Sequence, residues 1–547
     1  MKYTSNRRRF LEQIGTTSVA LAAGSWLSAI GYAQTRGPAR AIINQARYRS
    51  EMDRRILGSF LEHLGRAVYE GVYEPGSPLA DEHGFRRDVM AAVKELGVPI
   101  IRYPGGNFVS GYNWLDGVGP KNQRPTVLEK AWNSIETNQF GTNEFMQWCQ
   151  LVNTEPLLGF NLGTGTPASA AALAEYCNIE KGTKWSDLRR QHGYEKPWNV
   201  KYWCLGNEMD GPWQMGHMPA REYGRKARDA AQQIRVTTPN AKLIACGSSN
   251  TNMPTYLTWD REVLEECFDL VDGISLHNYY GNTPELSGND TSRYLAMNLD
   301  MEKQIQEIIA VCDYVQGLRK SPKQLWLSFD EWNVWYRARN GRFVDGERTF
   351  APHLLEEPYN LEDALLVGGF VNTLLRESHR VRVACLAQLV NVIAPLMTNE
   401  TSVLKQTIYY PFAWALKYAN GRVLDLEVES ETYPIRAGHL QADFARNDDV
   451  PYLDVVTTMD RKNGQASVFM LNRDLESERE LILEWRDPTP TSVLACETLT
   501  GGDLKALNTF DQPNLVVPSK LDAPQAGARM TFKLPARSYT VAHLATS

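Results

Sequence analysis

The chain has 547 residues, enough for one large domain and a smaller second one. Hydrophobic residues make up 43% of the chain and charged residues 22%, a balance typical of soluble globular proteins. The net charge of -6 provides no basic field for a nucleic-acid backbone, so we expect no nucleic-acid partner.

The N-terminus has the pattern of an export signal. Residues 7–11 read RRRFL, a moderately apolar run covers 14–30, and Gly31-Tyr32-Ala33 resembles a cleavage site between small residues. We therefore predict a twin-arginine signal peptide over residues 1–33 and a periplasmic or secreted protein. A membrane anchor is the alternative. The glycine, serine and threonine residues of the run make it a poor spanning helix, so we expect no membrane association after processing.

Residues 34–51 form a short segment before the first large domain. We expect it to join a C-terminal β-sandwich, because the two ends of a chain often meet. The chain also has eight cysteines, without C-x-x-C spacing or paired histidines. This pattern favours buried thiols over a zinc site.

Residues 52–411 alternate short apolar runs with amphipathic helical stretches. This alternation is typical of parallel strands joined by helices. The apolar runs number eight and cover residues 56–61, 98–103, 156–162, 201–205, 242–246, 271–276, 324–329 and 383–390. The helical stretches between them include residues 81–96, 144–152, 220–236, 299–318 and 361–377. Eight such units predict an α/β fold, a (β/α)8 TIM barrel. An open doubly wound sheet is the alternative, but the glycine-rich loop usual after its first strand is missing here.

Residues 412–547 have a different character. Helical periodicity fades, and β-rich runs at 466–471, 480–485 and 530–534 are separated by glycine and proline breaks. These features predict an antiparallel β-sandwich.

Polar residues follow the predicted barrel strands at their C-terminal ends, where barrels of this kind place their active sites. Glu208 follows the fourth strand and Glu331 the seventh. Strands four and seven lie nearly opposite each other, so the two carboxyl groups can face each other across the barrel mouth. Such a pair suits cleavage of a glycosidic bond, which needs an acid for the leaving oxygen and a nucleophile for the anomeric carbon.

A less specific interpretation must be weighed against this one. A glutamate after a strand is most often a surface residue or the start of a helix, and neither glutamate alone would indicate catalysis. The pair is more informative, because each glutamate follows an apolar strand within a polar cluster. We therefore predict that Glu208 is the acid/base and Glu331 the nucleophile, with Asn207 next to the sugar 2-hydroxyl.

Several long motifs occur in order through the barrel. They cover residues 60–66 (FLEHLGR), 102–108 (RYPGGNF), 116–120 (DGVGP), 203–213 (WCLGNEMDGPW), 275–282 (SLHNYYGN), 330–336 (DEWNVWY) and 387–393 (AQLVNVI). With these motifs the chain resembles glycoside hydrolase family 51, the α-L-arabinofuranosidases. The resemblance implies a retaining, exo-acting enzyme that removes terminal α-L-arabinofuranosyl residues from arabinan, arabinoxylan or derived oligosaccharides.

The resemblance also assigns residues. It matches the family's acid/base to Glu208 and its nucleophile to Glu331. It implies no metal or organic cofactor, and a homo-oligomer, often a hexamer in this family. The sugar-binding residues of the family match Glu62, Asn107, Asn207, Tyr279 and Gln388, with Trp335 as an aromatic wall and His277 as a further candidate from the end of strand six.

Two alternatives stay open at this stage. An endo-acting β-glycanase would use the same carboxylate pair in an open cleft, and products released from a polymer would distinguish it. A carbohydrate-binding protein without catalysis is the second alternative, although the presence of both carboxylates argues against it. A serine hydrolase is disfavoured because the chain has no G-x-S-x-G elbow.

Overall fold

The computed structural model describes residues 37–336, 348–435 and 449–547. The predicted signal peptide, residues 1–33, lies outside the described residues. Within the described part, no helix combines the length and apolar character that spanning a membrane requires.

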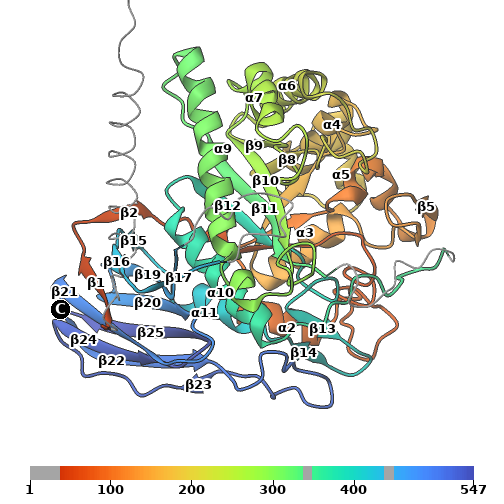
Figure 1. Cartoon of the computed structure of the whole chain (residues 1–547). Coiled ribbons are helices and arrows are strands. Elements are labelled where there is room, and N and C mark those ends of the chain that lie inside the picture. Colours follow the sequence, from red (N-terminus) through yellow and green to blue (C-terminus); the bar gives the residue numbers. More distant parts are fainter. Residues whose placement is uncertain (1–36, 337–347, 436–448) are drawn as a thin grey trace, which may run out of the picture.

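Eight parallel strands close into a barrel (Figure 1). Each overlaps one of the eight apolar runs of the sequence, and the predicted (β/α)8 barrel is confirmed. The strands are almost wholly buried because side chains fill the barrel inside and helices cover it outside. In chain order they are β3 (Gly58–Phe60), β4 (Ile100–Tyr103), β7 (Glu155–Gly159), β8 (Tyr202–Leu205), β9 (Lys242–Ala245), β10 (Gly273–Tyr280), β11 (Trp326–Val334) and β12 (Val381–Leu386).

Helices form the outer layer of the barrel (Figure 1). They are α2 (Arg87–Leu96), α3 (Thr142–Val152), α4 (Pro167–Asn178), α5 (Lys184–Gln191), α6 (Ala220–Thr237), α7 (Thr258–Cys267), α8 (Thr291–Tyr294), α9 (Met297–Arg319), α10 (Leu361–Arg376) and α11 (Tyr409–Tyr418). Helix α2 begins six residues after the predicted start at Asp81. The reason is local, because the Asp81 carboxylate accepts the backbone N–H groups of His83 and Phe85 and so holds a turn in place of a helix.

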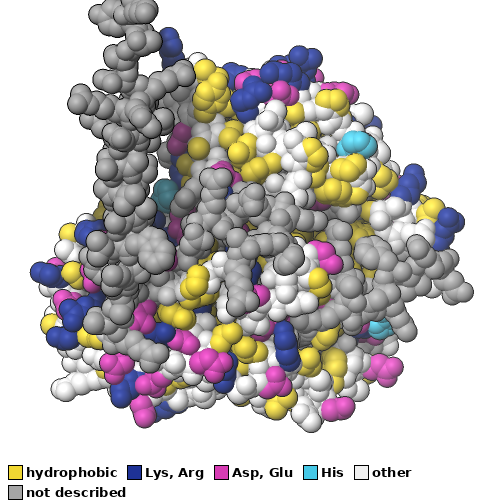
Figure 2. Space-filling view, viewed as in Figure 1, with side chains coloured by type: hydrophobic (Ala, Val, Ile, Leu, Met, Phe, Trp, Pro, Cys, Tyr) yellow, Lys and Arg dark blue, Asp and Glu magenta, His cyan; other side chains and the backbone are white. Residues whose placement is uncertain are grey.

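Helices α6 and α7 lie side by side at the top of the view in Figure 1. Figure 2 shows basic and acidic side chains mixed over this part of the surface. Arg221 of α6, for example, reaches Glu265 of α7 at 2.7 Å. Because the pair is exposed, it aligns the two helices more than it stabilises the fold.

The C-terminal part consists of two packed β-sheets, which confirms the predicted sandwich. One sheet has the order β16-β1-β21-β24 and the other β2-β15-β19-β20-β25-β22-β23. Their strands are β1 (Ala39–Asn44), β2 (Tyr48–Glu51), β15 (Arg422–Leu424), β16 (Val428–Glu429), β19 (Leu453–Asp460), β20 (Gln465–Asn472), β21 (Arg479–Asp487), β22 (Pro490–Leu499), β23 (Ser519–Lys520), β24 (Arg529–Leu534) and β25 (Ser538–Thr546). The N-terminal segment thus supplies one strand to each sheet. Helix α11 crosses residue 411, so the exact boundary at 411/412 stays a prediction.

Three short ribbons complete the described strands: β5 (Val127–Glu129) with β6 (Ser134–Glu136), β13 (Leu396–Thr398) with β14 (Val403–Lys405), and β17 (Thr432–Tyr433) with β18 (Val450–Pro451). All eight cysteines are buried as free thiols.

A buried ion network joins the sandwich to the barrel. Asp454 on β19 contacts Arg376 of α10 at 2.5 Å and Arg473 at 2.8 Å, and it accepts a hydrogen bond from Asn298 of α9. Burial alone would raise the pKa of Asp454, but the two arginines outweigh burial and lower it below its usual range. This network fixes the relative position of the two parts.

Candidate active site

The polar residues predicted from the sequence gather at the C-terminal mouth of the barrel. Glu62 follows β3, Asn207 and Glu208 follow β8, and Gln388 follows β12. His277 and Tyr279 lie on β10, and Glu331 lies on the neighbouring strand β11, opposite His277 in the parallel register. The strand ends therefore bring these side chains to one place.

The carboxyl groups of Glu208 and Glu331 face each other closely. One oxygen of each lies within 4.8 Å of the other. Retaining glycosidases hold their two carboxyl groups about 5–5.5 Å apart, whereas inverting enzymes need about 6.5–9.5 Å to admit a water molecule. The separation therefore favours direct attack on the sugar by one carboxylate.

Glu331 is held by a donor at each oxygen. The Arg102 guanidinium lies 2.6 Å from Oε1, and the Tyr279 hydroxyl donates to Oε2 at 2.8 Å. These two contacts hold both oxygens of Glu331 in fixed positions. Arg102 also binds Asp330 at 3.2 Å and donates to Asn207 Oδ1 at 2.6 Å, so one buried guanidinium organises the centre of the site.

Glu208 is placed by a sharp turn after β8. Gly206 has φ of 102°, which favours glycine, and Glu208 itself has φ of 44°, a strained conformation for a residue with a side chain. The turn aims the carboxyl group at the mouth. His277 Nδ1 lies 3.0 Å from Oε1, and the Trp213 indole N–H donates to Oε2 at 2.7 Å.

His277 lies between two carboxyl groups. Its Nδ1 faces Glu208, and its Nε2 lies 3.2 Å from Asp330. Burial works to lower the pKa of His277, but the charge of Glu331 and the hydrogen bonds to Asp330 and Glu208 outweigh it and raise the pKa to about 10. His277 is therefore a cation at neutral pH and donates from both ring nitrogens.

Glu62 lies at the same mouth and is almost wholly buried. Its Oε1 accepts hydrogen bonds from the Phe108 backbone N–H at 2.9 Å and from the Trp132 indole N–H at 3.0 Å. Gln388 accepts from the Glu62 backbone N–H at 2.9 Å, which orients the amide. Burial, and then the charge of Glu331, raises the pKa of Glu62 to about 8.

Asn207, Trp335 and Asn107 are the remaining predicted residues. The Nδ2 atom of Asn207 is buried without a hydrogen-bond partner among the described residues, so it can donate to a bound sugar. The Trp335 ring packs edge-on against Tyr279 with centroids 5.2 Å apart. Asn107 begins a short 3-10 helix directly after Gly106, but the structure shows no side-chain bond from it to the other predicted residues.

The same atoms could in principle hold a metal ion. A ring nitrogen of His277 and one oxygen each of Glu208 and Glu331 lie within 4.8 Å of one another. A metal ion there would compete with the Nδ1 proton of His277 and with the hydrogen bonds that Tyr279 and Trp213 donate to the two carboxyl groups. The chemistry of the group therefore suits proton and glycosyl transfer better than coordination.

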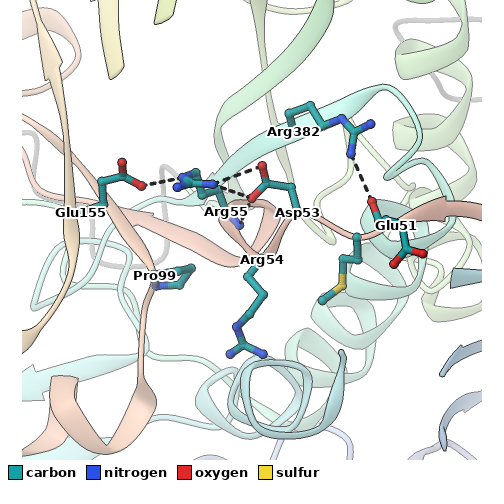
Figure 3. Close-up of a pocket in the computed structure, with 8 residues that line it drawn as sticks. Glu51, Asp53, Arg54, Arg55, Pro99, Glu155 and Arg382 are labelled. Carbon is teal, nitrogen blue, oxygen red and sulfur yellow. Dashed lines mark hydrogen bonds and ion pairs between the residues drawn. The ribbon is translucent and has the colours of Figure 1, made fainter. Parts of the chain in front are cut away.

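A cavity of about 410 Å³ opens at the opposite, N-terminal end of the barrel strands. Figure 3 shows Arg55 pointing between Glu155 and Asp53, with which it forms ion pairs at 2.6 and 3.1 Å. Arg54 donates to the carbonyl groups at the end of α11. These contacts tie the turn before β3 to β7 and to α11, and stabilising the fold is the usual role of this end of a barrel.

The sequence interpretation gave no role to Arg102, Asp330, Trp132 or Trp213. For Arg102 a signal existed, because an arginine inside an apolar barrel strand must find carboxylate partners when it is buried. Trp132 offered no signal. It reaches Glu62 from the β5–β6 hairpin, which spacing along the chain does not place near the mouth.

Two protein-family models match the chain: the α-L-arabinofuranosidase 1 domain over residues 92–298 and the α-L-arabinofuranosidase C-terminal domain over residues 330–538. Among curated proteins, the intracellular exo-α-(1→5)-L-arabinofuranosidase 1 of Bacillus subtilis is 47% identical over 87% of this chain and 93% of its own length. The exo-α-(1→6)-L-arabinofuranosidase of Bifidobacterium longum is 43% identical over 90% of this chain and 94% of its own length. A solved family 51 α-L-arabinofuranosidase from Bifidobacterium longum superposes with a TM-score of 0.87 at 38% identity, covering 93% of this chain and all of that one.

These relatives correct one prediction. The Bacillus subtilis enzyme and three other similar enzymes carry the word intracellular in their names. The prediction of a signal peptide with a periplasmic or secreted location is therefore wrong. An arginine run before a mildly apolar stretch is a short pattern, and few residues are needed to produce it without any role in export.

Proposed function

Because the chain belongs to the α-L-arabinofuranosidases of glycoside hydrolase family 51, we propose that Glu331 is its nucleophile and Glu208 its acid/base. The enzyme is a retaining, exo-acting glycoside hydrolase that releases terminal α-L-arabinofuranosyl residues. The observation that carries the residue assignment is the carboxyl pair within 4.8 Å, with Glu331 held by Arg102 and Tyr279.

In the first step Glu331 attacks the anomeric carbon and forms a glycosyl ester. Glu208 gives its proton to the glycosidic oxygen as the bond from that oxygen to the anomeric carbon breaks, so the remaining sugar leaves as a neutral alcohol. Arg102 and Tyr279 fix the two oxygens of Glu331 for this attack. Holding the nucleophile in place lowers the entropy cost of reaching the transition state.

In the second step the ionised Glu208 removes a proton from water, and the water oxygen attacks the anomeric carbon. The ester bond breaks, and Glu331 leaves as a carboxylate that again receives the hydrogen bonds of Arg102 and Tyr279. His277 and Trp213 donate hydrogen bonds to Glu208 and hold its carboxyl group in position during this step. Two inversions at the anomeric carbon give net retention.

The sugar-binding role goes to the residues around this pair. The free Nδ2 of Asn207 and the inward oxygen of Glu62 provide polar contacts, with Gln388 beside Glu62. Trp335 provides an apolar face next to Tyr279. Asn107 is included among the sugar-binding residues because it matches a sugar-binding residue of the family.

The substrate polymer, the linkage that is cleaved and the cellular location are also part of the proposal. Relatives named for (1→5) and (1→6) linkages support terminal arabinofuranosyl groups on arabinan- or arabinoxylan-derived oligosaccharides. Four relatives named intracellular support a location inside the cell. Resemblance to the family supports a homo-oligomer, which light scattering after gel filtration would measure.

The test is a comparison of initial rates on aryl α-L-arabinofuranoside, aryl β-D-xyloside and cello-oligosaccharides. We expect strong preference for the arabinofuranoside, and NMR of the first product should show the anomeric configuration of the substrate. Activity on the cello-oligosaccharides alone would replace this function with that of an endo-glycanase. Glu331→Gln should abolish turnover, whereas Glu222→Gln, at an exposed position on α6, should not.

A further inference from the structure

Glu62 uses its two oxygens differently. Oε1 is occupied by the N–H groups of Phe108 and Trp132. Oε2 faces the centre of the site, with only a long contact of 3.5 Å from Gln388. A Cβ atom at Gly106 would lie 3.0 Å from Oε2 of Glu62 and 3.2 Å from Oε1 of Glu331, so the two oxygens converge on one point of the pocket.

No cation compensates Glu62. The side chain is only 3% exposed, and among the residues that the structure describes it has no ion-pair partner within 4.0 Å. The nearby cations Arg102 and His277 are engaged by Glu331, Asp330 and Glu208. A negative charge on Glu62 would therefore be buried, unpaired and directed at the same point as the charge of Glu331, which is costly.

We propose that Glu62 is a neutral carboxylic acid at neutral pH and donates a hydrogen bond from Oε2 to a hydroxyl group of the bound sugar. This inference rests on the proposed function, because it concerns the same pocket. It gives Glu62 the role of a hydrogen-bond donor, whereas an ionised carboxylate could only accept. Sugar binding then depends on a proton that is separate from the one that Glu208 transfers.

The charges around Glu62 favour its neutral form. The groups that face it from the packed elements are Glu331 of β11, Glu129 of β5 and the hydroxyl of Tyr279 on β10. The carboxylate of Glu129 accepts the backbone N–H groups of Ala131 and Trp132, so it is not a donor to Glu62. The pKa of Glu62, about 8, is consistent with this arrangement, with burial as its main cause and Glu331 second.

The first test follows the pH dependence of KM. In the wild type we expect KM for aryl α-L-arabinofuranoside to rise about tenfold per pH unit above about pH 8, as Glu62 loses its proton. Glu62→Gln retains an acceptor at Oε1 and a donor in place of the Oε2 hydroxyl, so its KM should lose this rise. Glu62→Leu, which has neither, should bind at least tenfold more weakly than Glu62→Gln at pH 7. A rise that persists in Glu62→Gln would overturn the proposal.

The second test needs no substrate and so separates this inference from the proposed function. The infrared difference between wild type and Glu62→Gln should contain the C=O band of a protonated carboxylic acid at pH 7. By about pH 10 that band should be replaced by carboxylate bands. Carboxylate bands alone at pH 7 would overturn the proposal, even if the enzyme hydrolyses arabinofuranosides as expected.

Discussion

In the proposed mechanism Glu208 acts in both steps, so the effect of replacing it by alanine should depend on the leaving group. With an oligosaccharide, loss of the general acid should lower kcat/KM by about 10²–10⁴-fold, or about 2.7–5.4 kcal/mol. With a nitrophenyl arabinofuranoside the departing oxygen needs little proton transfer, so kcat/KM should fall far less. Its kcat and KM should both fall, because the ester on Glu331 accumulates when no base activates water.

The structure also predicts that a small anion will restore turnover. Without the carboxylate, His277 Nδ1 and the Trp213 indole N–H, which bound it at 3.0 and 2.7 Å, face an empty space beside the ester. Azide should bind there and release arabinosyl azide with the anomeric configuration of the substrate. The assay is steady-state kinetics on both substrates with and without azide, with Glu222→Ala as a surface control. Equal losses on both substrates, or no azide product, would refute the reasoning.

Three further variants test separate parts of the site and the fold. Tyr279→Phe removes a hydrogen bond to Glu331, and a hydrogen bond to a charged group is worth about 1.5–3 kcal/mol. We therefore expect kcat to fall about 10- to 150-fold, with a burst of aryl alcohol. An unchanged kcat would contradict this role of Tyr279. Gly106→Ala places a methyl group between Glu62 and Glu331 and should raise KM about tenfold or more, while an unaltered KM would mean that the sugar does not reach this point. Asp454→Asn should lower the free energy of unfolding in urea by about 3–5 kcal/mol with KM unchanged. Because the folded-state pKa of Asp454 is depressed, wild-type stability should decline as pH falls below about 4, and this part of the decline should be absent in the variant.

The barrel could be predicted from the sequence because its strands are local, nearly continuous apolar runs. Each is short, and helical periodicity separates it from the next, so the count of eight needed no long-range information. The start of α2 could not be predicted as well. The amphipathic pattern extends back to Asp81, but the side chain of that residue satisfies backbone N–H groups in a turn and delays the helix.

That Glu208 and Glu331 lie close together could also be predicted, because position at a strand end and residue type are both visible in the sequence. Their catalytic roles stay a proposal. The spacing of residues along the chain could not identify the side chains that contact Glu331 and Glu62. The contact of Arg102 with Glu331 links β4 to β11, and the contact of Trp132 with Glu62 links a hairpin to β3. Such contacts exist only after the barrel closes. The charge state of Glu62 likewise depends on burial and on Glu331, neither of which a motif records.

The location was the part of the sequence interpretation that was wrong. It depended on a few residues before the first strand, whereas the catalytic prediction depended on motifs throughout the barrel. The names of relatives that match most of the chain are therefore better evidence for the cellular location of the enzyme than a short pattern at the N-terminus.

The most direct test of the central claim is to trap the glycosyl ester. Glu208→Ala would be incubated with a nitrophenyl α-L-arabinofuranoside, quenched in acid and digested for mass spectrometry of its peptides. The account predicts one pentosyl group on the peptide that contains Glu331, located on Glu331 itself. A pentosyl group on another residue, or free arabinose formed without any adduct, would contradict the assignment of Glu331 as the nucleophile.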